Sequence, residues 1–338
     1  MKIMTNKFSN SIVITSIYLP TQAICKFATL KKYQLIVVGD KKTPLNWTCQ
    51  NAIYIPIKQQ TEMNYRIGKY LPYNHYSRKM VGYLYAIKNN ARIIIDADDD
   101  NIPYSFWEFP KAYGIYNMTN SGDRFLNIYS LFTKDKIWPR GLPLNKIGNL
   151  IDQKTIIKKK CKVGIWQGLA NGDPDVDAIY RLSINKSCYF QKNAPIVLKK
   201  GNIAPINSQN TLFTKKFFPL LYLPTSVTFR FTDILRGYVA QPILWAAGYN
   251  IGFTDATVLQ IRNEHDYMTD FRSEIPMYIN SENIINFVES SVSCSKSIEE
   301  NLYTAYKKLM QNNIVTKMEM KILESWLRDI EYAVHLVT

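Results

Sequence analysis

The sequence lacks the cysteine spacing of a disulfide-bonded or zinc-binding protein. Its five cysteines are odd in number, lie far apart and form no C-x-x-C pair, whereas disulfide frameworks and structural zinc sites use even or closely paired sets. They are Cys25, Cys49, Cys161, Cys188 and Cys294. A chain of this kind suits a reducing compartment, and we expect it in the cytoplasm.

Long apolar runs are missing too. No stretch approaches the ~18 consecutive apolar residues that a membrane-spanning helix needs. The N-terminus has lysines and then a short apolar run, but no small-residue cleavage site follows. We therefore interpret residues 12–17 as a first strand and not as part of a signal peptide. Repeats, low-complexity tracts and Gly/Ser linkers are absent as well, which predicts one domain with a helical tail.

Acidic residues are outnumbered by basic ones. The chain has 27 acidic and 42 basic residues, and the formal net charge of +15 implies an anionic partner such as a nucleotide, a nucleic acid or a membrane surface. The basic residues form scattered doublets and triplets without an RNA-binding or DNA-binding signature. We therefore expect a solvated basic surface and no nucleic acid partner, while contact of this surface with a membrane stays open.

The N-terminal part does have a regular alternation of apolar segments. Runs rich in β-branched residues predict strands at residues 12–17, 33–40, 51–56 and 91–96, and helical spacing of apolar side chains predicts helices at 21–30 and 77–90. Strands that alternate with helices in this way predict an α/β fold with a parallel sheet.

Four aspartates follow the last of these strands. Asp96, Asp98, Asp99 and Asp100 lie directly behind the apolar run 93–95, at a carboxyl end, where open α/β sheets bind their ligands. Carboxylates this close raise one another's pKa unless a cation neutralises them. A hard divalent ion is the usual partner, and such an ion commonly bridges protein to phosphate. The alternative is a solvated acidic turn that caps a helix.

The C-terminal part favours helices. The segment 231–253 begins as a helix that Gly248 is expected to close and that Pro242 can kink or break. The pairs Ser297–Glu300 and Thr316–Glu319 fit capping boxes for two terminal helices, which are expected to end near residues 312 and 336.

Six sequence blocks together resemble the STELLO family of glycosyltransferases. They are VVGDKKTP, LPYNHYSRKMVGYLYAIKNNARIIIDADDDN, RGLPLNKI, QGLANGDPDVDAIYRL, APINSQNTLF and RFTDILRGYVAQPILWAAGYNIGF. The blocks cover most of residues 12–275, in the family's order. They are also similar, more distantly, to the reversibly glycosylated polypeptides, which are also called UDP-arabinopyranose mutases.

The resemblance implies a GT-A fold, which is a Rossmann-like α/β fold. Its sheet is mixed, mostly parallel and sandwiched by helices, and a C-terminal helical tail follows. A GT-A domain would occupy residues 1–280, with a nucleotide-sugar-binding half at 1–102 and an acceptor-side half at 103–280. A helical extension at 281–338 would pack on the same domain. The nucleotide sugar would bind through a divalent metal, Mn²⁺ or Mg²⁺.

The family's D-x-D motif, at a strand end, implies the metal ligands. The match in this chain is Asp96-Ala97-Asp98. We assign Asp98 and Asp100 to the metal, because alternate residues of an extended chain face the same side, and Asp96 to the ribose. His265, beyond the last strand-like segment, is the third expected ligand; the alternative is a structural or exposed histidine.

The resemblance also implies contacts to the nucleotide sugar. Thr15, Ser16 and Asp40, at the ends of the first two strands, would touch the base and the ribose. Arg78 and Lys79 would donate hydrogen bonds to the diphosphate. Ordinary turn chemistry explains the first three residues equally well, and a solvated basic pair explains the other two.

Two aspartates are expected to be catalytic on the acceptor side. By resemblance, Asp233 lies where an acidic residue contacts the acceptor hydroxyl, and Asp177 lines the same side; an inverting reaction needs a base there. The alternative for Asp233 is a helix N-cap with a local ion pair to Arg236. By resemblance, Asp173 and Asp175 line the acceptor side as well. The alternative for these two residues is the capping of a turn.

These features predict a metal-dependent glycosyltransferase. Its donor would be a nucleotide sugar, UDP-linked in preference to GDP-linked, and its acceptor an unknown glycan, lipid or protein. Two alternatives stay open: a mutase that interconverts ring forms of a nucleotide-bound sugar, and a catalytically silent interaction or assembly factor. The sequence departs from the plant STELLO pattern because it has no N-terminal membrane anchor, so we expect a cytoplasmic enzyme with a basic face that can touch a membrane.

Overall fold

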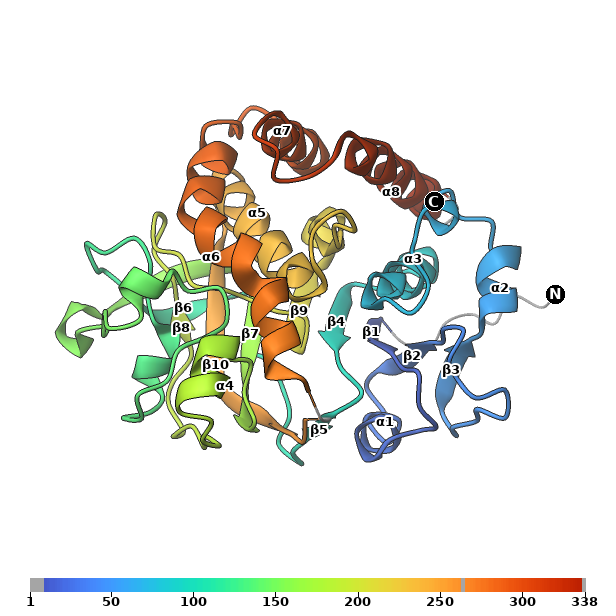
Figure 1. Cartoon of the computed structure of the whole chain (residues 1–338), viewed down its shortest axis with the longest axis horizontal. Coiled ribbons are helices and arrows are strands. Elements are labelled where there is room, and N and C mark those ends of the chain that lie inside the picture. Colours follow the sequence, from blue (N-terminus) through green and yellow to red (C-terminus); the bar gives the residue numbers. More distant parts are fainter. Residues whose placement is uncertain (1–8, 263–264, 336–338) are drawn as a thin grey trace.

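A ten-stranded mixed sheet runs through the molecule in the order β3-β2-β1-β4-β9-β7-β6-β8-β10-β5 (Figure 1). The computed structural model describes residues 9–262 and 265–335. Four parallel strands form its N-terminal side: β1 Asn10–Thr15, β2 Gln34–Val38, β3 Ala52–Ile55 and β4 Ile93–Ala97. These are the four strands that the sequence predicts. The apolar runs of β1, β2 and β4 are buried, as a sheet covered on both faces requires.

The other side of the sheet mixes strand directions. β9 Asn210–Thr214 lies antiparallel to both of its neighbours, β4 and β7 Ile157–Gly172. β7 pairs in parallel with β10 Asn250–Gln260. The shorter strands are β5 Asn101–Pro103, β6 Tyr113–Met118 and β8 Ile196–Val197.

Helices cover both faces of the sheet, which confirms the predicted α/β class (Figure 1). They are α1 Gln22–Phe27, α2 Ile57–Glu62, α3 Lys79–Lys88, α4 Ala178–Ser183, α5 Thr232–Ala246, α6 Tyr267–Glu289, α7 Ile298–Gln311 and α8 Lys317–His335. A large apolar core, with Leu84 of α3 and Trp326 of α8, fills one face, and a smaller core with Phe27 of α1 fills the other. Within the described ranges, no helix combines the length and apolarity needed to cross a membrane.

The helix predicted in segment 231–253 is present as α5. It continues through Pro242 to Ala246, so the proline does not break it. Gly248 has a φ of +77°, a left-handed conformation that glycine adopts without steric cost and that commonly ends helices. The predicted closing residue is therefore confirmed.

The first of the two predicted terminal helices is present as α7, which ends at Gln311, close to the expected end near residue 312. The expected division at residues 280 and 281 falls inside α6, which continues to Glu289, and the division into domains stays a prediction. At the start of α7, the Ser297 hydroxyl accepts a hydrogen bond from the Glu300 N–H at 3.1 Å, and the Ser297 N–H donates to the Glu300 carboxylate at 2.7 Å. This capping box is confirmed.

Glu319 has another role than the predicted capping box. α8 begins at Lys317, but the Glu319 side chain is fully buried. Its carboxylate accepts hydrogen bonds from the N–H of Thr225 at 3.1 Å and of Ser226 at 2.7 Å, and from the Tyr222 hydroxyl. These hydrogen bonds connect α8 to residues 222–226. The same helix packs on α3 (Figure 1). The predicted helix end near residue 336 lies outside the described residues.

We expect the Glu319→Gln variant to lose about 1.5–3 kcal/mol of unfolding free energy, the range for hydrogen bonds to a charged group. The amide keeps the size of the side chain, but it replaces one accepting oxygen by an NH₂ group that faces N–H donors. Urea unfolding measures the change. Glu62→Gln, at an exposed position of α2, is the control and should stay within about 0.5 kcal/mol; equal stability of the two variants would contradict the role of Glu319.

Candidate functional site

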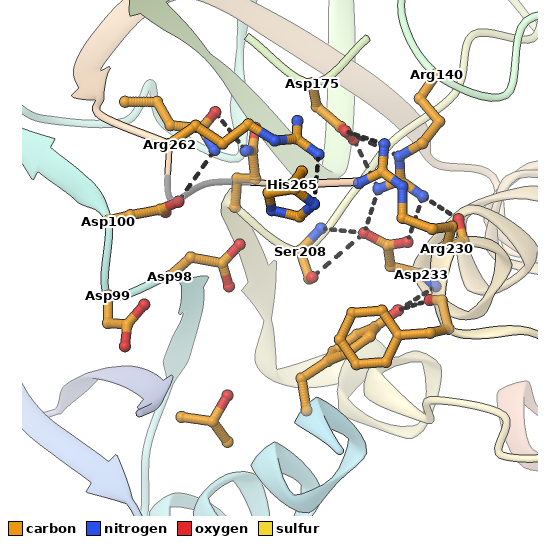
Figure 2. Close-up of a pocket in the computed structure, with 15 residues that line it drawn as sticks. Asp98, Asp99, Asp100, Arg140, Asp175, Ser208, Arg230, Asp233, Arg262 and His265 are labelled. Carbon is orange, nitrogen blue, oxygen red and sulfur yellow. Dashed lines mark hydrogen bonds and ion pairs between the residues drawn. The ribbon is translucent and has the colours of Figure 1, made fainter. Parts of the chain in front are cut away.

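A pocket opens at the carboxyl ends of β1 and β4. Its wall consists of Thr15, Tyr76, Asp98, Asp99, Asp100, Arg140, Asp175, Ser208, Gln209, Phe229, Arg230, Asp233, Gln260, Arg262 and His265. Figure 2 shows the three consecutive aspartates on one side and a group of arginines and carboxylates on the other. We refer to Asp98–Asp100 as the acidic wall and to Arg140, Arg230 and Arg262 as the basic wall.

The acidic wall is a short connection between two strands. β4 ends at Ala97, and β5 begins at Asn101, which pairs with Gln260 at the end of β10. The Gln260 amide also donates to the Asp100 carboxylate at 3.3 Å. From β1, the Ser16 hydroxyl donates to the Asp99 carboxylate at 2.5 Å. Three strands therefore fix this segment of the pocket.

Two buried cations lie beneath the acidic wall. The ammonium of Lys79, the first residue of α3, is 2.8 Å from the Asp96 carboxylate and 2.6 Å from that of Asp98. The guanidinium of Arg236 on α5 lies 2.7 Å from the other oxygen of Asp96. Burial alone would lower the pKa of Lys79, but the carboxylates of Asp96 and Asp98 raise it. Asp96 and Lys79 are thus engaged with each other and are not among the pocket-lining residues, where ribose and diphosphate contacts were expected.

The remaining carboxylates carry charge that their neighbours do not fully neutralise. Burial, together with the charges of Asp100 and Asp96, raises the pKa of Asp98 to about 7 in spite of Lys79. Burial and the charge of Asp99 raise the pKa of Asp100 to about 6. Such raised values are the response of carboxylates to a missing counter-charge.

His265 lies in the same pocket but faces another carboxylate. Its Nδ1 is 3.1 Å from the Asp270 carboxylate and 3.5 Å from the Arg262 guanidinium. Among residues 9–262 and 265–335, no three His, Cys, Asp or Glu side chains are grouped so as to hold a metal ion. The structure brings Asp98, Asp100 and His265 to one pocket without forming a three-ligand site, so the metal role of His265 stays a prediction.

Arg140 organises the basic wall. Its guanidinium forms paired hydrogen bonds to Asp175, both at 2.8 Å, and to Asp233, at 3.1 and 3.0 Å. Arg140 also holds the pKa of Asp175 at about 2, against the opposing effect of burial. The next residue, Gly141, has a φ of +96°, and a Cβ there would lie 2.6 Å from the Ile234 side chain. The turn that aims Arg140 therefore requires glycine.

Arg262 is the least neutralised cation of the basic wall. Its side chain is only 6% exposed, and the Asp270 carboxylate is 3.3 Å away. Among the described residues its Nε has no hydrogen-bond partner. Burial and the like charge of Arg230 lower its pKa. Arg230, by contrast, is paired with Glu274 at 2.8 Å. A buried guanidinium that lines a pocket and has an N–H without a partner among the described residues is suited to bind an anionic ligand.

The two predicted catalytic aspartates lie in different places. Asp233 is in the pocket wall, where it also accepts hydrogen bonds from the Ser208 N–H and hydroxyl at 3.2 and 3.3 Å. Its ion pair is with Arg140 and not with Arg236, which bonds to Asp96 instead.

Asp177 is fully buried and does not line the pocket. It caps α4 by accepting from the Tyr180 N–H at 2.8 Å, and it accepts from the Trp138 indole at 2.7 Å. Burial raises its pKa to about 6. The structure therefore gives Asp177 a capping role and does not support the predicted catalytic one. The neighbouring Asp173 pairs with Arg181.

The predicted donor-binding residues are only partly brought together. Thr15 lines the pocket, and Ser16 touches it through Asp99. The Asp40 carboxylate instead accepts from the His75 N–H at 3.3 Å. The Arg78 side chain is buried, donates to the Gln60 side chain at 2.6 and 2.9 Å and is not among the residues that line the pocket.

Sequence reasoning missed all three arginines of the basic wall, and Ser208 of the pocket. Arg140, Arg230 and Ser208 lie in three of the sequence blocks that carry the family resemblance, and Arg262 lies three residues before His265. The blocks were the available signal. In a chain with 42 basic residues, nothing in a single sequence marks the few that are buried.

The chain is similar to known proteins along most of its length. The family model described as STELLO glycosyltransferases matches residues 230–335. Over 94% of the chain, identity is 30% to "Probable glycosyltransferase STELLO2" and 28% to "Probable glycosyltransferase STELLO1", both from Arabidopsis thaliana. These alignments cover 44% of each plant protein, so the chain spans less than half the length of these relatives.

Solved structures show a more distant likeness. A crystal structure of glucosyl-3-phosphoglycerate synthase from Mycobacterium tuberculosis, in complex with Mn²⁺, UDP-glucose and glycerol 3-phosphate, is similar over 81% of this chain and 79% of that chain. The identity is 10% and the TM-score 0.39.

We expect Lys79→Met to cost about 3–5 kcal/mol of unfolding free energy, because it leaves a buried carboxylate without one of its cations. The substitution keeps the apolar stem and removes only the ammonium. Chemical denaturation at neutral pH measures the loss. Lys88→Met, at an exposed position of the same helix, is the matched control, with an expected change within about 0.5 kcal/mol. Similar losses in both variants would contradict the proposed neutralisation.

Manganese should stabilise the protein more at about pH 8 than at about pH 5. The folded pKa values of Asp98 and Asp100, about 7 and about 6, lie above the ordinary value of 3.8. The folded state therefore holds more protons than the unfolded state between these values, and the contribution of both groups to stability falls as pH rises through that window. A bound cation removes this penalty only where the carboxylates are ionised.

Thermal unfolding with and without Mn²⁺ across this pH range provides the measurement. The double variant Asp98→Asn and Asp100→Asn should show no pH-dependent gain, while Asp123→Asn, at an exposed site outside the pocket, should behave like the wild type. An equal gain at both pH values, or a gain that survives in the double variant, would contradict binding at the acidic wall.

Proposed function

The chain is a relative of the STELLO glycosyltransferases, and from this premise we propose that it transfers a sugar from a nucleoside-diphosphate sugar to an acceptor. One observation carries the proposal: the pocket at the carboxyl ends of the parallel strands has an under-neutralised acidic wall that faces an under-partnered arginine. A divalent cation and a diphosphate together satisfy both walls.

The charges of the acidic wall fit a divalent ion. Asp96, Asp98, Asp99 and Asp100 carry four carboxylates in this segment, and the two buried cations beneath them are Lys79 and Arg236. Two negative charges remain when all four carboxylates are ionised, which is the charge that one Mn²⁺ or Mg²⁺ offsets. Asp98, one-third exposed, and Asp100 would hold the ion. The ion would neutralise the diphosphate as the glycosidic bond breaks.

Lys79 contributes by holding Asp98 in place. Because its ammonium bonds to one oxygen of Asp98 and to Asp96, it fixes the direction of the Asp98 carboxylate without entering the pocket. A ligand that is already oriented loses less conformational entropy when it binds a cation. Lys79 is thus a positioning residue in this proposal and not a diphosphate ligand.

Arg262 would bind the diphosphate from the other side. Its Nε, which has no partner in the described part of the chain, lies in a nearly buried side chain. A hydrogen bond from a guanidinium to phosphate is charge-assisted. The leaving nucleoside diphosphate gains negative charge as the sugar departs, so a fixed cation stabilises the transition state more than the ground state.

Asp233 would position the acceptor hydroxyl. Arg140 and Ser208 hold its carboxylate in the pocket wall. Beside it, Phe229 is half exposed and makes an edge contact with Tyr76, with ring centroids 4.7 Å apart. An exposed aromatic ring next to a fixed carboxylate offers an apolar contact and a hydrogen bond, which suits a partly polar acceptor.

Isothermal titration with UDP as the probe tests this proposal. UDP should bind only when Mn²⁺ is present, Asp100→Asn should remove the metal-dependent part, and Arg262→Met should weaken binding about 10- to 100-fold, as expected for a charged hydrogen bond. Asp123→Asn, outside the pocket, should bind like the wild type. Absence of binding at about millimolar UDP with Mn²⁺ would overturn the proposal.

A second assay separates transfer from ring interconversion. With a panel of UDP-sugars, a glycosyltransferase releases UDP and this release increases with a suitable acceptor. Interconversion of ring forms without an acceptor and without UDP release would show a mutase instead.

A further inference from the structure

A row of lysines lies on one face of the antiparallel strand pair β6 and β7. In this antiparallel pairing Tyr113 lies opposite Lys162, Ile115 opposite Lys160, and Asn117 opposite Lys158. Directly opposed residues of an antiparallel pair point to the same side of the sheet. The three lysines therefore form a row on one face, each beside a β6 residue, and all three are exposed.

An apolar side chain stands in the middle of this row. Ile115 is 73% exposed and Tyr113 57% exposed, although burial of such side chains normally stabilises a protein by about 1.5–3 kcal/mol each. On the opposite face of this strand pair Cys161 and Met118 are buried, while Ile157 is 43% exposed and Lys159 is exposed. The two most exposed apolar residues of the pair, Ile115 and Tyr113, lie on the face that carries the three lysines.

A second group of cations continues the surface beyond Tyr113. A hollow there is lined by Arg92, Ala112, Tyr113, Thr214, Lys215, Lys216 and Tyr249. The Tyr113 and Tyr249 hydroxyls are hydrogen-bonded at 2.8 Å, and the Lys216 ammonium lies 4.8 Å from the centre of the Tyr249 ring. Within the described chain, none of the ion pairs involves the cations of the row or of the hollow.

We propose that this basic face binds the surface of a membrane that contains anionic lipids. The row Lys158, Lys160 and Lys162 would face the lipid headgroups, the hollow would take a headgroup phosphate, and Ile115 would enter the boundary between headgroups and acyl chains. Cations around an exposed apolar residue, next to an amphipathic tyrosine pair, are the combination that interfacial membrane binding uses.

The chemistry of the face favours lipid over nucleic acid. Single-stranded nucleic acids stack their bases on the faces of exposed aromatic rings. Here the most exposed apolar group is the aliphatic Ile115, and the Tyr113 hydroxyl is tied to Tyr249. An aliphatic side chain gains nothing from base stacking, but it gains free energy on leaving water for lipid.

The basic face is separate from the pocket. It lies at the amino end of β7, whereas Asp175 of the pocket follows the carboxyl end of that strand. From Lys162 to Gly172 the strand spans roughly 30 Å at about 3.3 Å per residue. Figure 1 shows β6 and β8 on the side of the molecule away from β1–β3. Membrane binding at this face would leave the pocket open, and it does not depend on the proposed transferase activity.

Flotation with vesicles tests the inference. The wild-type chain should float with phosphatidylcholine vesicles that contain phosphatidylserine and not with pure phosphatidylcholine. The triple variant Lys158→Glu, Lys160→Glu and Lys162→Glu should bind at least about a hundredfold more weakly, since each lysine near an anionic surface contributes about a factor of five to ten. Ile115→Ser should weaken binding about tenfold.

The matched control reverses three exposed lysines of the terminal helices, Lys307, Lys317 and Lys321, with the same loss of net charge. It should float like the wild type. Circular dichroism confirms the fold of each variant. Absence of wild-type flotation, an equal loss in the control, or full binding by the Ile115→Ser variant would overturn the inference. The inference would also be overturned if an oligonucleotide displaced the protein from vesicles and if binding of that oligonucleotide required Lys158, Lys160 and Lys162.

Discussion

The buried ammonium of Lys79, placed between Asp96 and Asp98, is the contact on which the pocket depends. With Arg236, it joins the end of β4 to the first turn of α3 and to α5, which are far apart in the sequence. Desolvating such charges costs several kcal/mol per ion. The cluster offsets this cost because both oxygens of Asp96 and one oxygen of Asp98 lie within 2.8 Å of a cation. The outcome is that two of the strand-end aspartates are held by the protein itself, and the turn after β4 has a fixed direction.

The clustered aspartates are partly neutralised by cations of the chain itself. Mutual repulsion among carboxylates predicts a neutralising cation, and within the described residues Lys79 and Arg236 supply part of it from the chain. The rest of the repulsion persists at Asp98 and Asp100, as their raised pKa values show. In the same pocket the reverse situation holds at Arg262, whose Nε has no acceptor among residues 9–262 and 265–335. Two opposite deficits that face one pocket favour a ligand that brings both a cation and an anion.

The sequence predicted features that depend on residues close together in the chain and missed those that depend on residues far apart. Strands β1–β4, the close of α5 at Gly248 and the Ser297 capping box depend on neighbours a few residues apart, so local patterns were sufficient to predict them. The strands from β5 to β10 pair across long, turn-rich loops. Arg236 reaches Asp96 over 140 residues and Glu319 reaches Thr225 over 94. Each of these polar side chains also had a plausible local partner, Asp233 and Thr316 respectively, and a single sequence cannot show that burial favours the distant one.

The net charge of +15 is unevenly distributed in the folded chain. In the pocket, arginines and carboxylates are nearly matched: Arg140 lies between Asp175 and Asp233, and Arg230 pairs with Glu274. The excess positive charge is therefore a property of the outer surface, such as the antiparallel pair β6 and β7, where lysines have no acidic partners among the described ion pairs. Composition predicts an anionic partner for the whole chain. The folded chain instead suggests two separate anionic partners. The proposed partner in the pocket is a diphosphate that binds together with a divalent cation, and the proposed partner of the basic face is an extended anionic surface that requires no added cation.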